Sequence, residues 1–289
     1  MIFRDDLLQD KVILVTGGGT GLGRQMAETF GRLGAKLALV GRRADVLEQA
    51  RVQMQAQNLT VWVHPLDIRM PDAVDQVMDE IFMHYGKLDV LVNNAAGNFI
   101  SPTERLSPRA VDAVINIVLH GTMYCTLAAG KRWIARGEPG TVLNITTTYA
   151  WTGSGYVVPS AVAKAGVLAM TRSLATEWAP HHIRQVAIAP GPFPTQGAWS
   201  RLMPTEELAN AAQNRVPLKR VGRPEELTTL AAYLVSDAAA YINGEVVTID
   251  GGEWLYGAGM FNGLDRLTQD DWDRMRELMP KKSSPKMGE

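Results

Sequence analysis

Ser160 and Lys164 have the spacing in this sequence with the clearest chemical meaning. They stand four residues apart, so on a helix both side chains face the same side. A tyrosine paired with a lysine at this spacing can pass a proton to a carbonyl oxygen. Here the partner of Lys164 is a serine, whose hydroxyl is too short and too weakly acidic to replace a phenol with a pKa of about 10. Tyr149 is the upstream tyrosine best placed to take over, with Tyr156 a weaker candidate. A phenol at position 149 instead of position 160 predicts chemistry at a bond other than a simple carbonyl.

A glycine-rich turn near the N-terminus is the second motif. The apolar run Val12–Thr16 predicts a buried strand, and glycines at positions 17, 18, 19, 21 and 23 follow it before a helical pattern begins. Such glycines let the backbone approach a pyrophosphate at the helix N-terminus. A plain glycine-rich turn is the alternative, but the strand–turn–helix context favours dinucleotide binding. The predicted contacts are Gly17, Gly19, Thr20, Gly21 and Leu22.

The end of the second predicted strand, Leu37–Gly41, distinguishes between the two nicotinamide dinucleotides. An acid at this place usually holds the ribose 2′-hydroxyl of NAD. Here Arg42 and Arg43 follow instead, and a guanidinium suits a 2′-phosphate by its charge and its planar set of donors. A solvated charge pair at the start of a helix is the alternative. The sequence therefore favours NADPH, with Arg42 as the main contact.

Polar or small residues end the other predicted strands, where an open parallel sheet binds its ligand. Asp67 follows the third strand, where a carboxylate can meet the adenine amino group. Asn93 and Ala95 end the fourth strand, beside the expected ribose and nicotinamide. The remaining predicted cofactor contacts follow the sixth strand and are Pro190, Gly191 and Phe193.

Apolar runs alternate with helical patterns along the chain, which predicts one α/β domain over residues 1–289. We expect a doubly wound parallel sheet of about seven strands with helices on both faces. Residues 195–224 hold no strand pattern and are interpreted as a substrate lid, and residues 254–280 as a helical C-terminal extension. The predicted strands are Val12–Thr16, Leu37–Gly41, Val61–Pro65, Val90–Asn93, Val142–Thr146, Val186–Ala189 and Val246–Asp250; the main helices lie near 22–33, 44–57, 72–85, 109–136, 161–179 and 225–235.

Composition limits the partners. The chain carries 29 Lys and Arg against 30 Asp and Glu, which gives no support for a nucleic-acid or membrane-surface partner. Cys125 is the only cysteine, which fits a reducing compartment and a small core residue. The five histidines show no metal-ligand spacing, so no metal is expected. No apolar run is judged long enough to span a membrane and no targeting signal is recognised, so we expect a cytoplasmic protein.

Together the motifs resemble the short-chain dehydrogenase/reductase family over about residues 10–252. The matching elements are Thr16-Gly17-x-x-x-Gly21-x-Gly23, Asn93-Asn94-Ala95-x-Gly97, Lys164, Pro190-Gly191 and Asp250-Gly251-Gly252. The resemblance implies a Rossmann fold and a homotetramer. The family normally carries a catalytic Asn, Ser, Tyr and Lys. Asn116 and Lys164 match this pattern, Thr147 stands at the serine position, and Ser160 departs from the tyrosine.

Longer stretches resemble one branch of that family, the 2,4-dienoyl-CoA reductases. These stretches are residues 93–107, 145–164, 190–202 and 257–279. The branch adds hydride to C5 of a dienoyl thioester, charge moves onto the thioester oxygen, and C2 is then protonated to leave a 3-enoyl thioester. Donors are therefore needed several carbons away from the hydride. This requirement accounts for a tyrosine that has moved from its usual helix to a strand end.

The resemblance also assigns roles to single residues. Tyr149 and Asn98 become hydrogen-bond donors to the thioester oxygen, and Lys164 binds the nicotinamide ribose. Ser160 contacts cofactor or substrate, or else only fills space, and Asn116 is catalytic or structural.

The acyl-CoA substrate has its own implied contacts. They are Arg69, Phe99, Ser107 and Arg201, with the two arginines on CoA phosphates and Phe99 on the acyl chain. Ser107 followed by Pro108 also fits an ordinary helix N-cap.

Two other functions compete with dienoyl reduction. A reductase of 3-oxoacyl or trans-2-enoyl thioesters needs a working donor near Lys164, and Ser160 argues against one. A non-catalytic NADP(H)-binding protein would explain the absent tyrosine. The retention of Lys164 together with the Asn98 and Tyr149 pair argues against that interpretation.

Overall fold

A seven-stranded parallel sheet forms the centre of the molecule in a computed structural model that describes residues 4–195 and 205–279. The strand order is β3-β2-β1-β4-β5-β6-β7. This order reverses between β1 and β4, so a crevice opens at the carboxyl ends of these two strands. The strands are β1 Val12–Thr16, β2 Lys36–Gly41, β3 Val61–Pro65, β4 Val90–Asn93, β5 Gly140–Ile145, β6 Ile183–Pro190 and β7 Val246–Ile249.

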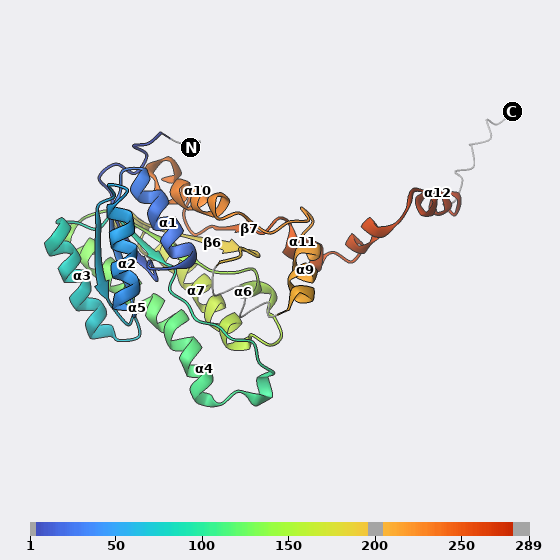
Figure 1. Cartoon of the computed structure of the whole chain (residues 1–289), viewed down its shortest axis with the longest axis horizontal. Coiled ribbons are helices and arrows are strands. Elements are labelled where there is room, and N and C mark those ends of the chain that lie inside the picture. The colour runs from blue at the N-terminus through green and yellow to red at the C-terminus, as the bar shows by residue number, and fades with distance from the viewer. Residues whose placement is uncertain (1–3, 196–204, 280–289) are drawn as a thin grey trace.

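Helices cover both faces of this sheet (Figure 1). The central strand β1 is rich in branched apolar residues and is buried along its whole length, because neither face of the sheet meets water there. The doubly wound single-domain fold expected from the sequence is therefore confirmed. The helices are α1 Gly21–Arg32, α2 Ala44–Gln55, α3 Pro71–Tyr85, α4 Pro108–Ile115, α5 Gly121–Arg136, α6 Tyr149–Thr152, α7 Val158–Glu177, α9 Glu206–Arg215, α10 Pro224–Val235, α11 Glu253–Ala258 and α12 Gln269–Glu277.

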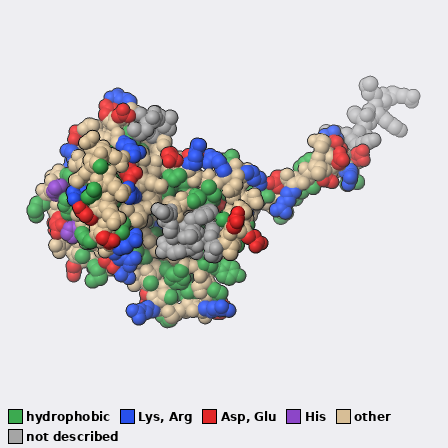
Figure 2. Space-filling model, in the orientation of Figure 1, with side chains coloured by type: hydrophobic (Ala, Val, Ile, Leu, Met, Phe, Trp, Pro, Cys, Tyr) green, Lys and Arg blue, Asp and Glu red, His purple; other side chains and the backbone are tan. Residues whose placement is uncertain are grey.

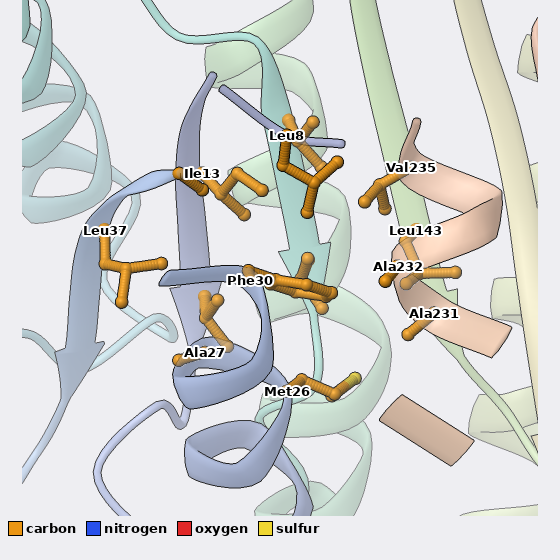
Figure 3. Close-up of a cluster of buried hydrophobic side chains, with 14 of the residues drawn as sticks. Leu8, Ile13, Met26, Ala27, Phe30, Leu37, Leu143, Ala231, Ala232 and Val235 are labelled. Carbon is orange, nitrogen blue, oxygen red and sulfur yellow. The ribbon is translucent and has the colours of Figure 1, made fainter. Parts of the chain in front are cut away.

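Two hydrophobic layers hold the helices against the sheet. In the first layer Phe30 and Met26 of α1 face Val235 and its neighbours on α10, with Leu8 closing one end (Figure 3). In the second layer α3 and α5 pack on the opposite face, where Trp133 is fully buried. Each fully buried side chain of this size stabilises the fold by roughly 1.5–3 kcal/mol. These layers fix the strand ends that carry the candidate site.

The segment predicted as one helix near 109–136 is a composite. Between α4 and α5 the structure inserts a π-helical segment, η2, at Asn116–His120. The expectation that no apolar run is long enough to span a membrane was wrong. Helix Pro108–Arg136, 29 residues long, meets that criterion by length and composition. Half of its most apolar window is buried inside the protein, as is common for a core helix.

The C-terminal extension leaves the body of the molecule. After α11 the chain passes through the short helical turn Asn262–Arg266 to α12, which lies well away from the sheet (Figure 1). The visible face of the body shows acidic and basic side chains interspersed, without a large field of one sign (Figure 2). Of the expected lid at 195–224, the structure describes Thr195 and residues 205–224, which include α9.

Candidate active site

A cavity of about 260 Å³ lies where β1, β2, β3 and β4 end. It brings together the predicted cofactor contacts Gly17, Gly19, Thr20, Arg42, Asp67 and Ala95. Gly17 has φ +66°, a conformation that favours glycine, and an added Cβ would stand 3.1 Å from the Cα of Ala95. Glycine is therefore required at position 17 both by the backbone conformation of this turn and by its close packing against Ala95.

The N-terminus of α1 opens into the same cavity. Thr20 is the N-cap residue of α1, and its side chain makes no capping hydrogen bond to the described residues. The first N–H groups of α1 are thus available to an anion such as a pyrophosphate. Gly21 and Leu22 form this first turn. The Leu22 side chain packs against the first hydrophobic layer, so its contact with a cofactor would be through the backbone.

Charged side chains also line this cavity. Arg42 and Arg43 are both exposed and both line it, so two guanidinium groups are open to an anionic ligand. Asp67 also lines the cavity and accepts a hydrogen bond of 2.9 Å from Nε of Arg69. This hydrogen bond is the main reason why the pKa of Asp67 lies below its usual range. Arg69 is therefore placed beside the cofactor cavity, and its contact with CoA stays a prediction.

A buried polar network supports the strand ends. The Thr16 hydroxyl accepts hydrogen bonds from the backbone N–H groups of Asn94 and Ala95, each at 3.0 Å. The Asn93 amide donates to Thr126 and Asn144, each at 2.9 Å, and is almost fully buried. Asn93 was predicted as a cofactor contact. Its side chain is committed to the core, so such a contact would need its backbone.

A second cavity, of about 720 Å³, lies beyond β5 and β6. Pro190, Gly191 and Phe193 line it, together with Thr147 and Tyr149. The expectation that Tyr149 ends a strand is wrong, because β5 ends at Ile145 and Tyr149 opens the four-residue helix α6. The competitor Tyr156 has 64% of its surface exposed. The structure thus favours Tyr149 as the phenol of this cavity.

Tyr149 and Ser160 are in direct contact. The Tyr149 hydroxyl lies 3.1 Å from Oγ of Ser160, within hydrogen-bond distance. Ser160 is 2% exposed and belongs to α7, one turn before Lys164. Ser160 therefore does more than fill space, because its hydroxyl is within hydrogen-bond distance of the Tyr149 phenol.

Lys164 is buried beside this pair. Its Nζ donates to the backbone carbonyl of Ile145, the last residue of β5, and the residue is 8% exposed. Burial lowers the pKa of Lys164 to about 8, because the charged ammonium loses its hydration. A cation held here would raise the acidity of neighbouring hydroxyl groups.

The segment after β4 carries the other predicted donor. Asn98 is half-buried, and its Oδ1 accepts a hydrogen bond of 2.9 Å from the N–H of Phe99. Ser101 N–H donates to the carbonyl of Tyr156 at 2.9 Å, which ties this segment to the turn before α7. Phe99 is 38% exposed, and its contact with an acyl chain stays a prediction.

Three further predicted residues have different outcomes. Ser107 is the N-cap of α4, where Oγ accepts from Ala110 N–H at 3.2 Å, so its capping role is shown. Asn116 begins the π-helical segment, and its Oδ1 lies 2.9 Å from Nδ1 of His120. Single π turns in helices are frequent at functional sites. Arg201 lies outside the described residues.

The sequence interpretation missed one wall of the second cavity. Arg215, Glu253 and Trp254, from α9 and α11, line it together with Tyr149. These residues are remote in sequence from Tyr149 and share no motif with it. Within residues 4–195 and 205–279, no group of three or more His, Cys, Asp or Glu side chains is arranged to hold a metal ion.

Comparison with known proteins agrees with this geometry. A family model described as Enoyl-(Acyl carrier protein) reductase matches residues 17–253. A probable 2,4-dienoyl-CoA reductase of Bacillus subtilis, named as producing (2E)-enoyl-CoA, is 44% identical over 86% of this chain and 98% of its own. A probable 2,4-dienoyl-CoA reductase of Caenorhabditis elegans, named as producing (3E)-enoyl-CoA, is 45% identical over 96% of this chain and 92% of its own.

A solved structure completes the comparison. The crystal structure of a short chain dehydrogenase from Bacillus anthracis superposes with a TM-score of 0.80 at 43% identity, and covers 87% of this chain and 100% of that one. The sequence matches, the parallel sheet and the glycine turn all indicate the same family. The chain belongs to the short-chain dehydrogenase/reductase family, among relatives that include 2,4-dienoyl-CoA reductases.

Proposed function

We propose that this protein reduces 2,4-dienoyl-CoA to 3-enoyl-CoA with NADPH, a step in the β-oxidation of unsaturated fatty acids. The hydrogen bond between Tyr149 and Ser160 carries this proposal. It places a phenol in the cavity while a serine occupies the helix position that a carbonyl reductase needs for tyrosine. The names of the relatives support the same substrate.

The cofactor suits the first cavity. NADPH, when bound, supplies hydride to C5 of the substrate. The glycine turn and the N-terminus of α1 would hold its pyrophosphate, and Arg42 its 2′-phosphate. Lys164 would hold the nicotinamide ribose from the buried side. The choice of NADPH over NADH depends on Arg42.

The second cavity would stabilise the charge that develops on the substrate. Once C5 has gained hydride, negative charge collects on the thioester oxygen. Tyr149 would donate a hydrogen bond to that oxygen from the wall of this cavity, and Asn98 would donate one from the segment after β4. A single donor of this kind lowers the barrier by about 2.7–4 kcal/mol. Ser160 orients the Tyr149 hydroxyl, and Lys164 raises the acidity of both groups by its charge.

One experiment separates this function from its competitors. NADPH absorbance is followed with 2,4-dienoyl-CoA, trans-2-enoyl-CoA and 3-oxoacyl-CoA in parallel. We expect oxidation with the dienoyl substrate alone. Oxidation with trans-2-enoyl-CoA would favour the activity in the description of the family model. Oxidation with 3-oxoacyl-CoA would favour a carbonyl reductase, and binding of NADPH without any oxidation would indicate a non-catalytic binding protein.

The product is a second discriminator, since the names of two relatives differ on it. We expect NMR of the product to place the double bond between C3 and C4. A product with the bond between C2 and C3 would show protonation at C4 instead. We further propose a homotetramer in the cytoplasm; sedimentation analysis and a fluorescent fusion test these two proposals.

A further inference from the structure

Glu253 lies in the wall of the catalytic cavity and has no role in the mechanism proposed so far. It is the first residue of α11, and it lines the same cavity as Tyr149 and Thr147. Its side chain is 22% exposed, which is low for a glutamate at the start of a surface helix. A half-buried carboxyl group that faces the substrate cavity calls for an explanation.

The fold holds Glu253 at a fixed place relative to Tyr149. Asp250 accepts hydrogen bonds of 2.9 Å from the N–H groups of Gly252 and Trp254, which anchors the first turn of α11. Trp254 then meets Trp151 of α6 edge to face, with ring centroids 5.7 Å apart. Tyr149 stands two residues before Trp151, and Glu253 one residue before Trp254. The aromatic contact therefore joins the two short helices that carry the phenol and the carboxyl group.

Burial and two charged neighbours set the pKa of Glu253. Burial raises the pKa of its carboxyl group, and the nearby Asp250 carboxylate raises it further, whereas Arg215 of α9 opposes the shift. The Arg215 guanidinium is 69% exposed and stands 3.7 Å from the carboxylate, which is longer than a hydrogen bond. Tyr149 faces the same cavity from α6. This environment favours the protonated form of Glu253 more than solvent does.

We propose that Glu253 is the acid that protonates C2 of the substrate, an inference that rests on the proposed dienoyl-CoA reduction. After hydride has reached C5, the O–H bond of the Glu253 carboxyl group breaks and a C2–H bond forms. The C1–C2 π electron pair of the dienolate takes this proton, and an oxygen electron pair restores the thioester carbonyl. The C3–C4 double bond, formed when hydride reached C5, remains in the product. The carboxylate regains its proton from solvent. Tyr149 and Asn98 donate hydrogen bonds to the thioester oxygen, while Glu253 donates a proton to C2.

Glu253→Gln tests this role, since it keeps the size of the side chain and removes the proton. We expect kcat with 2,4-dienoyl-CoA to fall by about 10²–10⁴-fold. NADPH affinity, measured by fluorescence titration, should stay within twofold, because Glu253 does not line the cavity at the ends of β1 to β4 that would hold the pyrophosphate and the 2′-phosphate. Glu253→Asp should retain part of the rate. Glu207→Gln, an exposed glutamate in the first turn of α9, is the matched control and should leave kcat unchanged.

The pH profile separates an acid from a structural residue. With Glu253 as the acid, wild-type kcat falls as pH rises above the pKa of this group, which gives the pH profile a descending limb. The slower Glu253→Gln variant should lack this descending limb. A kcat within threefold of wild type in Glu253→Gln would overturn the proposal. So would a large loss that keeps the wild-type limb. If wild type leaves 2,4-dienoyl-CoA unreduced, the proposed function fails and this inference fails with it, whereas an active wild type with an active Glu253→Gln variant rejects Glu253 alone.

Discussion

The cofactor cavity and the catalytic cavity share the carboxyl edge of one sheet, yet they are built in different ways. The first is lined mainly by short contiguous segments that follow β1 to β4. The second depends on side chains from α6, α7, α9 and α11, which are remote from one another in sequence. A site built from contiguous segments depends on local backbone conformation. A site assembled from side chains that are distant in sequence can acquire a new chemistry when one residue moves.

Tyr149→Phe should separate the two cavities most sharply. The variant removes one donor to the thioester oxygen, so kcat should fall by about 10²–10³-fold. NADPH binding should be unchanged, because Tyr149 does not line the cavity that contains the glycine turn and Arg42. Stopped-flow absorbance at saturating NADPH measures the rate. Tyr156→Phe is the control on an exposed tyrosine, and wild-type turnover in Tyr149→Phe would remove Tyr149 from the mechanism.

Lys164→Met tests the residue proposed to serve both cavities. The pKa of Lys164 is about 8 in the folded protein and ordinarily 10.5, so between these pH values the unfolded chain binds a proton that the folded protein has released. Stability of the cofactor-free protein therefore rises with pH in this window, by about 3 kcal/mol at most. The variant should lack this rise. Urea unfolding at pH 7, 8.5 and 10 measures the difference, and parallel curves for the two proteins would show that the amine is not desolvated.

Arg42→Ala probes the cofactor cavity alone. Loss of charge-assisted hydrogen bonds to the 2′-phosphate should raise the Kd for NADPH by about tenfold or more, which corresponds to 1.5–3 kcal/mol. The Kd for NADH should hardly change. Arg43→Ala is the adjacent control and should have a smaller effect. An unchanged preference for NADPH in Arg42→Ala would mean that another group reads the phosphate.

Ser160→Ala should have the smallest effect of the series. It removes one hydrogen bond to Tyr149 while the phenol remains, so kcat should fall about fivefold, corresponding to roughly 1 kcal/mol. The double variant with Tyr149→Phe should lose no more than Tyr149→Phe alone. Additive losses would show that Ser160 acts on substrate or cofactor independently of Tyr149.

The same contrast explains how far sequence reasoning reached. The strand–glycine–helix unit around Gly17 is local, so its spacing predicts its geometry. Tyr149 was proposed for the site from a resemblance, but its contact with Ser160 requires α6 to fold back onto α7. Glu253 and Trp254 reach the cavity only through tertiary packing of α11. The π-helical segment at Asn116 depends on hydrogen-bond register, to which a 3.6-residue hydrophobic pattern is insensitive.

The four-residue length of α6 also bears on how the enzyme responds to heat. Helices this short are unstable alone, and residues 151–156, which include the last two residues of α6, are exposed. Tyr149 thus belongs to a segment that can open locally, whereas Ser160 and Lys164 belong to a 20-residue helix. We expect amide exchange to be fast around α6 and slow along α7. Inactivation on warming should then precede global unfolding, and the contact of Trp151 with Trp254 would set the interval between them.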